Sequence, residues 1–290
     1  MSEIKNQTVF ISGATSGLGL EAAEYFVKSG NSVIFCARND DAVIQTHNHL
    51  SDLSVNNQLI LGFTKDVSDQ DATKQMIISL QESGISINVL ICNAGVIGPI
   101  DKFLDTDLQV WQEAFNINLY GTINLIKGLL PSMVARRFGR VIHISGGGAT
   151  SPLYGMSSYA ASKAAAVRLI ETLSLEYEGS GVTFNSIAPG MLKTKLLDQM
   201  LDAGPKRIGE NLFRKSSAKS DALTDSTEQA LKLMDFLASN KSDGITGRLI
   251  SAEWDNWSEW PKHLSEIKNS DLYTIRRITG RDRGQEWGDL

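Results

Sequence analysis

Short apolar runs rich in β-branched residues recur along the chain, and longer stretches of mixed polar and apolar residues separate them. The continuous apolar character of these runs indicates strands that are buried on both faces. Alternation of such strands with helical stretches is typical of a parallel sheet with crossover helices. The runs that predict strands are Thr8–Ile11, Ser32–Cys36, Gln58–Phe63, Asn88–Cys92, Arg140–Ser145, Val182–Ile187 and Gly247–Ser251.

The stretches between the runs predict helices. Within Leu18–Lys28 the apolar residues fall on two adjoining helical rows, and both Leu108–Arg137 and Ser158–Glu178 are long enough for helices that cover a sheet. We therefore expect an α/β fold with a doubly wound, Rossmann-like parallel sheet of about seven strands. This single domain would span residues 1–252.

Residues 253–290 form a C-terminal extension beyond the last predicted strand. The extension is too apolar for a solvated tail and too short for a core of its own. We expect it to pack on the domain or on a subunit partner, and a lid over the substrate site is the alternative. It contains four of the five tryptophans and several arginines: Trp254, Trp257, Trp260, Trp287, Arg276, Arg277, Arg281 and Arg283.

Charge and cysteine content narrow the range of partners. Lys and Arg total 28 against 33 Asp and Glu, a net charge of −5, which provides no basic surface for nucleic acid or anionic membranes. Cys36 and Cys92 lie in apolar runs, as expected of buried thiols in a reducing compartment. No targeting pattern and no apolar run of about 18 residues occurs. We expect a cytoplasmic protein that binds a small molecule and no metal, because His47 and His49 have no further ligands at metal-site spacing.

A glycine-rich turn connects the first predicted strand directly to a helix. Its glycines have the spacing Gly-x-x-x-Gly-x-Gly. Glycines at this place permit a tight turn and a close approach of the backbone to pyrophosphate, whose charge the helix N-terminus stabilises. The residues expected to bind a dinucleotide here are Gly13, Thr15, Ser16, Gly17, Leu18 and Gly19.

The end of the second predicted strand indicates which dinucleotide is bound. An acidic residue there would accept from the adenosine 2′-hydroxyl, but Ala37 holds the position and Arg38 follows it. A guanidinium suits a 2′-phosphate because it donates two charge-assisted hydrogen bonds. We expect NADP in preference to NAD, and a solvated loop arginine is the alternative.

Tyr159 and Lys163 are four residues apart, on one face of a predicted helix. A tyrosine with its free pKa of about 10 is a weak base at neutral pH, and a neighbouring cation stabilises the phenolate. The pair is therefore a candidate for general acid/base chemistry.

Together these motifs resemble the short-chain dehydrogenase/reductase family, in its NADP-preferring branch, from the first strand to about Ala252. The order of the motifs along the chain carries the resemblance. Besides the glycines and the Tyr159/Lys163 pair, they include Asp66-Val67, Asn93-Ala94-Gly95, Asn118 to Gly121, and Pro189-Gly190 with Thr194.

The resemblance implies a role for each matching residue. Tyr159 would be the general acid/base, Lys163 would hold the nicotinamide ribose, and Asn118 would anchor a water of the proton relay. Asp66 and Val67 would contact adenine. The stretch Asn93, Ala94 and Gly95 would lie beside the cofactor ribose, and Pro189, Gly190 and Thr194 would face the nicotinamide.

One position departs from the family pattern. The family places a serine thirteen residues before the tyrosine, where this chain has Gly146. Either the glycines let Ser145 turn into the site, or Thr150 or Ser151 substitutes, or a backbone N–H of the glycine run binds the substrate oxygen. Ser145 is the candidate catalytic residue.

The resemblance implies an oxidoreductase that interconverts a secondary alcohol and a ketone by hydride transfer. A sugar, polyol or nucleotide-sugar substrate and an NADP-binding sensor without turnover are the alternatives. Leu196–Lys219 lies where the family builds its substrate pocket, and it is either a hinged lid or a surface loop. His143 is expected to be a satisfied core histidine. A homodimer or homotetramer is the expected assembly.

Overall fold

The computed structural model describes residues 4–221 and 227–285, which form a three-layer α/β structure around one parallel sheet. The strand order is β3-β2-β1-β4-β5-β6-β7, and all neighbours pair in parallel, so the expected doubly wound fold is confirmed. The strands are β1 (Thr8–Ser12), β2 (Ser32–Ala37), β3 (Ile60–Thr64), β4 (Val89–Cys92), β5 (Gly139–Ile144), β6 (Val182–Ala188) and β7 (Arg248–Ser251).

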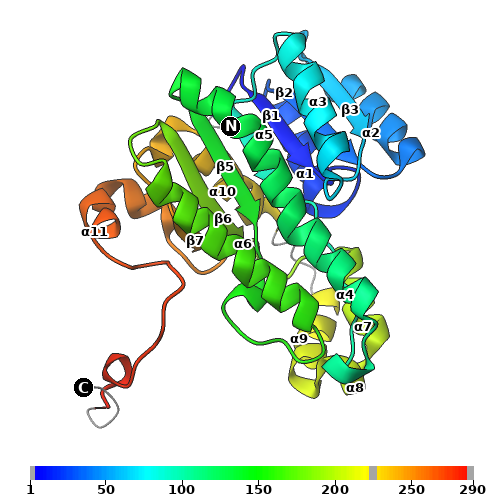
Figure 1. The fold of residues 1–290 in the computed structure, drawn as a ribbon, viewed down its shortest axis with the longest axis vertical. Helices are drawn as coiled ribbons and strands as arrows, with labels where there is room; N and C mark the ends of the chain where they lie inside the picture. The colour runs from blue at the N-terminus through cyan, green and yellow to red at the C-terminus, as the bar shows by residue number, and fades with distance from the viewer. Residues whose placement is uncertain (1–3, 222–226, 286–290) are drawn as a thin grey trace.

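Helices cover both faces of the sheet (Figure 1). Apolar residues of α1, α2 and α10 pack on one face, and those of α3, α5 and α6 pack on the other. The larger helices are α1 (Gly17–Lys28), α2 (Asp40–Leu53), α3 (Gln70–Glu82), α4 (Leu108–Phe115), α5 (Gly121–Arg136), α6 (Ser157–Glu176), α7 (Lys195–Ala203), α9 (Glu210–Asp221) and α10 (Thr227–Ala238). Two short ones are α8 (Pro205–Ile208) and α11 (Leu264–Lys268). None of the helices in the described ranges has the length and apolar character needed to span a bilayer.

The helix expected over Leu108–Arg137 is interrupted. A π-helical turn, Asn116–Tyr120, separates α4 from α5. The wider turn inserts a residue into the helical repeat, a device found mostly at functional sites. Here it turns Asn118 inward, where the side chain is fully buried. Periodicity cannot reveal such an insertion, because the apolar pattern continues on both sides of it.

The C-terminal extension covers the outer edge of the sheet. The Leu249 N–H of β7 donates to Tyr273 O at 2.8 Å. Buried Arg248 donates from its guanidinium to the carbonyls of Ile267 at 2.5 Å, Ser270 at 3.1 Å and Leu272 at 2.9 Å. The extension therefore supplies hydrogen-bond partners to a strand edge that would otherwise be open to pairing with another chain.

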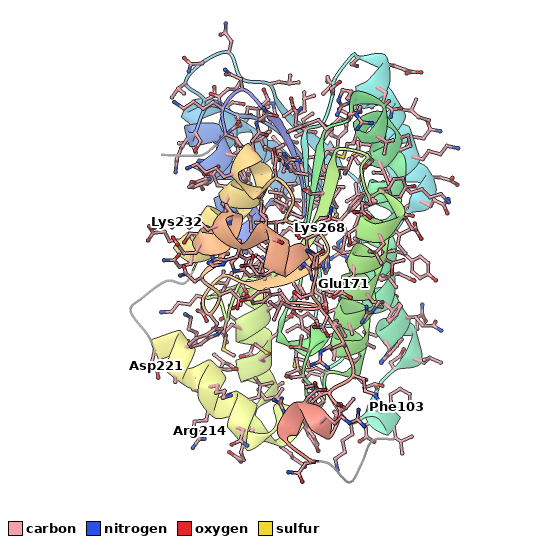
Figure 2. All side chains as sticks on the ribbon, turned by 90° about the vertical axis from the view of Figure 1, so that its left-hand side faces the viewer. Phe103, Glu171, Arg214, Asp221, Lys232 and Lys268 are labelled. Carbon is pink, nitrogen blue, oxygen red and sulfur yellow. The ribbon has the colours of Figure 1, made fainter. Side chains whose placement is uncertain are left out.

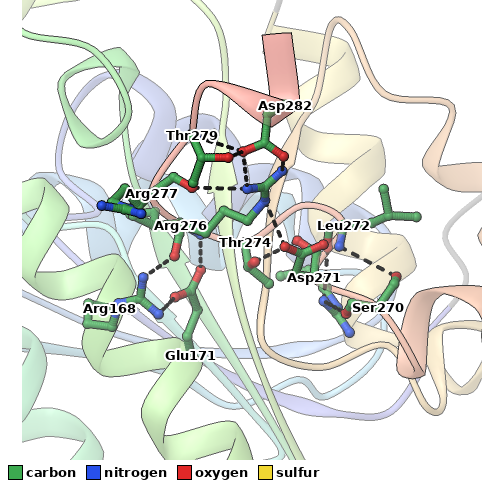
Figure 3. A network of polar contacts seen from close by, with 12 residues as sticks. Arg168, Glu171, Ser270, Asp271, Leu272, Thr274, Arg276, Arg277, Thr279 and Asp282 are labelled. Carbon is green, nitrogen blue, oxygen red and sulfur yellow. Dashed lines mark hydrogen bonds and ion pairs between the residues drawn. The ribbon is translucent and has the colours of Figure 1, made fainter. Parts of the chain in front are cut away.

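Further polar contacts fix the extension to α6 (Figure 3). The carboxylate of Glu171 accepts from Ile275 N at 2.7 Å and pairs with Arg168 at 2.6 Å. Arg276 pairs with Asp271 at 2.7 Å and with Asp282 at 2.9 Å, and these contacts brace the segment beyond Ile275.

The tryptophans of the extension have different environments. Trp257 stacks at a tilt on Phe236 with ring centres 5.3 Å apart, and Trp260 packs on Tyr273 at 4.2 Å. Trp260 is only 5% exposed, whereas Trp254 is 84% exposed. Trp287 lies outside the described residues.

Trp260→Ala should reduce the free energy of unfolding by about 3–5 kcal/mol, because it leaves a cavity in the core. Trp254→Ala should change it by less than about 0.5 kcal/mol. Urea unfolding of both variants, followed by circular dichroism, measures the difference. Equal effects of the two substitutions would show that the extension contributes nothing to the core.

Candidate active site

A cavity of about 1300 Å³ opens at the carboxyl ends of the strands. It lies at the topological switch point between β1 and β4, where the strand order reverses. This is the usual ligand site of a doubly wound sheet. All but one of the candidate residues line it: Gly13, Thr15, Ser16, Gly17, Leu18, Gly19, Arg38, Asp66, Val67, Asn93, Ala94, Gly95, Ser145, Tyr159, Lys163, Pro189, Gly190 and Thr194. Asn118 lies behind the wall.

The loop between β1 and α1, together with the first turn of the helix, has glycines at three positions, Gly13, Gly17 and Gly19. Gly13 and Gly17 have φ of +68° and +53°, values that favour glycine. A Cβ at Gly19 would overlap the Gly13 carbonyl and the Asn93 amide, which itself donates to Gly13 O at 3.1 Å. The N-terminus of α1 therefore borders the cavity, and the glycines allow a ligand to approach the backbone there. This cradle fits the pyrophosphate of a dinucleotide.

Two cations lie side by side at the far end of this cradle. Ala37 pairs with Thr64 in the β2–β3 register, so the next residues, Arg38 and Lys65, are neighbours, and both line the cavity. Arg38 is exposed and makes no hydrogen bond or ion pair within the described ranges. Sequence reasoning missed Lys65, because only the pairing of the two strands brings it next to Arg38.

Tyr159 and Lys163 lie on α6 and face the cavity between β5 and the phosphate cradle. The Lys163 ammonium donates to Ile144 O at 2.6 Å and is 5.9 Å from the centre of the Tyr159 ring. Burial lowers the pKa of Lys163 to about 8 and raises the pKa of Tyr159 to about 12. In this arrangement desolvation outweighs the expected effect of the cation on the phenol, and Tyr159 carries its proton at neutral pH.

Asn118 supports Lys163 from behind. Its side chain accepts from Val96 N at 2.8 Å and donates to Val96 O and Ser162 Oγ, both at 2.9 Å. Gly95 separates it from Lys163: a Cβ there would lie 3.2 Å from Asn118 Oδ1 and 3.4 Å from Lys163 Nζ. The amide thus fixes the chain at the floor of the site.

The structure explains why position 146 has no side chain. A Cβ on Gly146 would overlap the Tyr159 hydroxyl oxygen. Ser145 is 3% exposed, lines the cavity, and its Oγ has no hydrogen-bond partner in the described part of the chain. Thr150 and Ser151 also line the cavity. The serine typical of the family would stand at position 146, one residue after Ser145. Ser145 therefore offers an unpartnered hydroxyl in the cavity wall next to that position.

His143, expected to be a satisfied core histidine, is only half satisfied. Its Nδ1 lies 3.2 Å from Ser186 Oγ, whereas its buried Nε2 has no partner among the described residues. Burial, with Lys163 nearby, holds its pKa well below the usual value. The ring is neutral and does not line the cavity.

The chain around Leu196–Lys219 forms helices α7, α8 and α9. Leu196, Met200 and Leu212 line the cavity, and Gly204 and Gly209, with φ of +75° and +81°, separate the helices. Glu253 and Trp254 of the C-terminal extension also line the cavity. These two residues are at the start of the extension, for which a place over the substrate site was the alternative expectation, and Glu253 was not among the expected site residues.

Comparison with known proteins is decisive for the family. A family model described as short chain dehydrogenase matches residues 7–203. The chain belongs to the short-chain dehydrogenases. It is 28% identical over 247 residues to the 3-oxoacyl-[acyl-carrier-protein] reductase FabG of Buchnera aphidicola, covering 85% of this chain and 96% of that protein.

Solved structures share the fold. Carveol dehydrogenase from Mycobacterium avium, in complex with NAD, has a TM-score of 0.75 at 22% identity, covering 87% of this chain and 97% of that one. A variant of actinorhodin polyketide ketoreductase with NADPH has a TM-score of 0.75 at 24% identity, covering 85% and 95%. The short-chain dehydrogenase described here is thus an NAD(P)-binding oxidoreductase that acts on CH–OH or ketone groups.

Gly146→Ala should reduce NAD(P)-dependent turnover by about 100-fold or more, because the Tyr159 hydroxyl must move away from the new methyl group. Gly147→Ala is the matched control, since a Cβ there meets nothing within 4 Å. Steady-state kinetics of the two variants measure the effect. Equal turnover would show that the contact between Gly146 and Tyr159 does not matter for the reaction.

Proposed function

We propose that this protein is an NADP-dependent oxidoreductase that interconverts a secondary alcohol and a ketone, with Tyr159 as the general acid/base. The observation that carries the proposal is the gathering of three elements in one cavity: the glycine-rich phosphate cradle, the Tyr159 hydroxyl against Gly146, and the buried Lys163 ammonium. A binding protein without turnover has no need for the last two. The relative FabG is named as a reductase of 3-oxoacyl groups, which supports carbonyl chemistry.

The dinucleotide, when bound, supplies the hydride donor or acceptor. Its pyrophosphate would lie on the glycine cradle from Gly13 to Gly19, with the adenine beside Asp66 and Val67. The Asp66 carboxylate is already oriented, because it accepts from Ser68 N at 2.8 Å and Ser68 Oγ at 2.7 Å. Asn93, Ala94 and Gly95 would flank the ribose, and Pro189, Gly190 and Thr194 would face the nicotinamide.

The protonated Tyr159 fits the role of acid toward a carbonyl oxygen. A phenol with a raised pKa holds its proton until substrate oxygen develops negative charge. Lys163 has two of its three ammonium hydrogens left after its bond to Ile144 O, enough to hold a ribose and to stabilise the phenolate that remains. Asn118 would keep the relay aligned from behind, and the free Ser145 hydroxyl would orient the carbonyl.

The preference for NADP rests on charge. Arg38 and Lys65 form a cationic pair at the end of the cradle where a 2′-phosphate would lie. Among the residues that the structure describes, Asp66 is the acidic side chain at that end, and its carboxylate is engaged by Ser68. Neighbouring structures hold either NAD or NADPH, so the local charge supports the choice and the fold does not.

Tyr159→Phe should reduce turnover by about 10²- to 10⁴-fold, because it removes only the proton-transferring oxygen. Binding of NADPH should stay within twofold of the wild-type value. Following NADPH absorbance with a panel of ketones, and titrating NADPH by calorimetry, measures both. Retained turnover would exclude Tyr159 as the acid, and absence of any turnover in the wild type would favour the sensor alternative.

Arg38→Met should weaken NADPH binding by about tenfold, or about 1.4 kcal/mol, because it removes a charge-assisted contact to the 2′-phosphate. NADH, which lacks that phosphate, serves as the internal control and should bind unchanged. Paired fluorescence titrations of both nucleotides give the ratio. Equal weakening for both would mean that Arg38 does not read the phosphate.

We also propose that the protein works in the cytoplasm as a homodimer or homotetramer. The exposed residues of α5 and α6, such as Lys127, Arg168 and Leu175, leave these two helices open to a second copy of the chain, which supports this assembly. Size-exclusion chromatography with light scattering tests it directly.

A further inference from the structure

The cavity wall beyond the catalytic residues is apolar. It is formed by the loop after β4, the segment before α6, and helices α7 and α9. Its members are Ile97, Leu153, Met156, Leu196, Met200 and Leu212. Such a wall removes an apolar substrate body from water near the reacting carbon.

Helix α9 borders this cavity, and contacts lie near both of its ends. Before its start, Arg207 of α8 pairs with Asp101 of the loop after β4 at 3.4 Å, and the Arg207 carbonyl lies against Gly155, just before α6. Near its end, Lys219 pairs with Glu253 at 3.8 Å. Figure 2 shows Asp221 and Arg214 along the outer side of this helix. The residues of its inner side therefore face the substrate half of the cavity.

Lys215 belongs to that inner side. It follows Leu212 by three residues and precedes Lys219 by four, so the three share one helical face, and both Leu212 and Lys215 line the cavity. Lys215 is exposed and makes no hydrogen bond or ion pair within the described ranges. Its ammonium is thus an uncompensated charge at the edge of an apolar wall.

The other charges of the cavity are already accounted for. Its acidic residues are Asp66, at the adenine end, and Glu253, which Lys219 neutralises. Lys195 directly follows Thr194, whose methyl carbon would lie 3.1 Å from a Cβ on Gly17, so the start of α7 lies beside the phosphate cradle. Among the described cations that line the cavity, Lys215 is the one on α9, the helix that carries the apolar Leu212.

We propose that the substrate is a ketone or alcohol with an apolar body and an anionic group, a carboxylate or a phosphate, and that Lys215 binds this anion. The inference rests on the proposed oxidoreductase function and specifies the substrate class of the same site. A positive charge at the edge of a cleft with apolar walls attracts an anion, and this contact would fix the orientation in which the carbonyl meets Tyr159.

Binding measurements test the proposal without hydride transfer. The protein, saturated with oxidised NADP, is titrated with benzoylpropionate, with its neutral methyl ester and with phenacyl phosphate, and heats of binding are recorded. At least one anion should bind tenfold or more tightly than the ester, and the carboxylate and phosphate arms identify which anion is preferred. Lys215→Met should abolish this advantage, while Lys215→Arg should keep most of it.

The neighbouring Arg214→Met is the matched control, because Arg214 lies on the outer side of α9 and does not line the cavity. It should leave the advantage of the anion unchanged. Equal affinities of anions and ester in the wild type, no binding of either anion, or an advantage that survives Lys215→Met would overturn the proposal. Affinity for NADPH, measured on each variant, should not change; a weakening in Lys215→Met would assign the lysine to the cofactor and also overturn it. NADPH consumption with the neutral ester tests the oxidoreductase function separately.

Discussion

Burial of a parallel sheet on both faces is the constraint on which the rest of this structure depends. Helices on each side exclude water from β1, β4, β5 and β6, so polar groups can be reached only at the carboxyl ends of the strands. The phosphate cradle begins one residue after β1, and Asn93 and Ser145 each lie one residue after the end of a strand. The cavity is therefore a consequence of how the sheet is covered, and the loops decide its chemistry.

Glycine is needed at the positions of the site where another residue approaches the backbone too closely to leave room for a Cβ atom. Gly19 lets the first loop contact Asn93, Gly95 lets Asn118 and Lys163 approach each other, and Gly146 leaves room for the Tyr159 hydroxyl. Each substitution would place a methyl group against a polar atom that the site requires. The family's serine position is thus incompatible with the present placement of Tyr159, and the neighbouring Ser145 is the hydroxyl that remains free.

Features with a local cause could be predicted from the sequence. All seven strands agree with the expected ones within a few residues, because each is a short run rich in apolar and β-branched residues, and the Gly13–Gly19 turn follows from its place between strand and helix. Features created by pairing between distant segments could not. Lys65 becomes a neighbour of Arg38 only through the β2–β3 register, and the inward turn of Asn118 depends on a π-helical insertion without a periodic signal. The partners of Arg248 and Glu171 in the extension are equally invisible, because they are mostly main-chain carbonyl and N–H groups.

Burial changes the pKa values of the two titratable groups at the reacting centre, Tyr159 and Lys163. At the reacting centre, burial keeps the phenol of Tyr159 protonated and destabilises the ammonium of Lys163, so both groups are held in less hydrated states than free side chains. The hydroxyl oxygens of a nicotinamide ribose beside Lys163 would accept hydrogen bonds from the ammonium, oppose this desolvation and favour the charged form, which in turn favours a phenolate on Tyr159. Cofactor binding would then change the acid strength of Tyr159 through Lys163. The proton can therefore be held firmly in the free protein and be released only in the assembled complex.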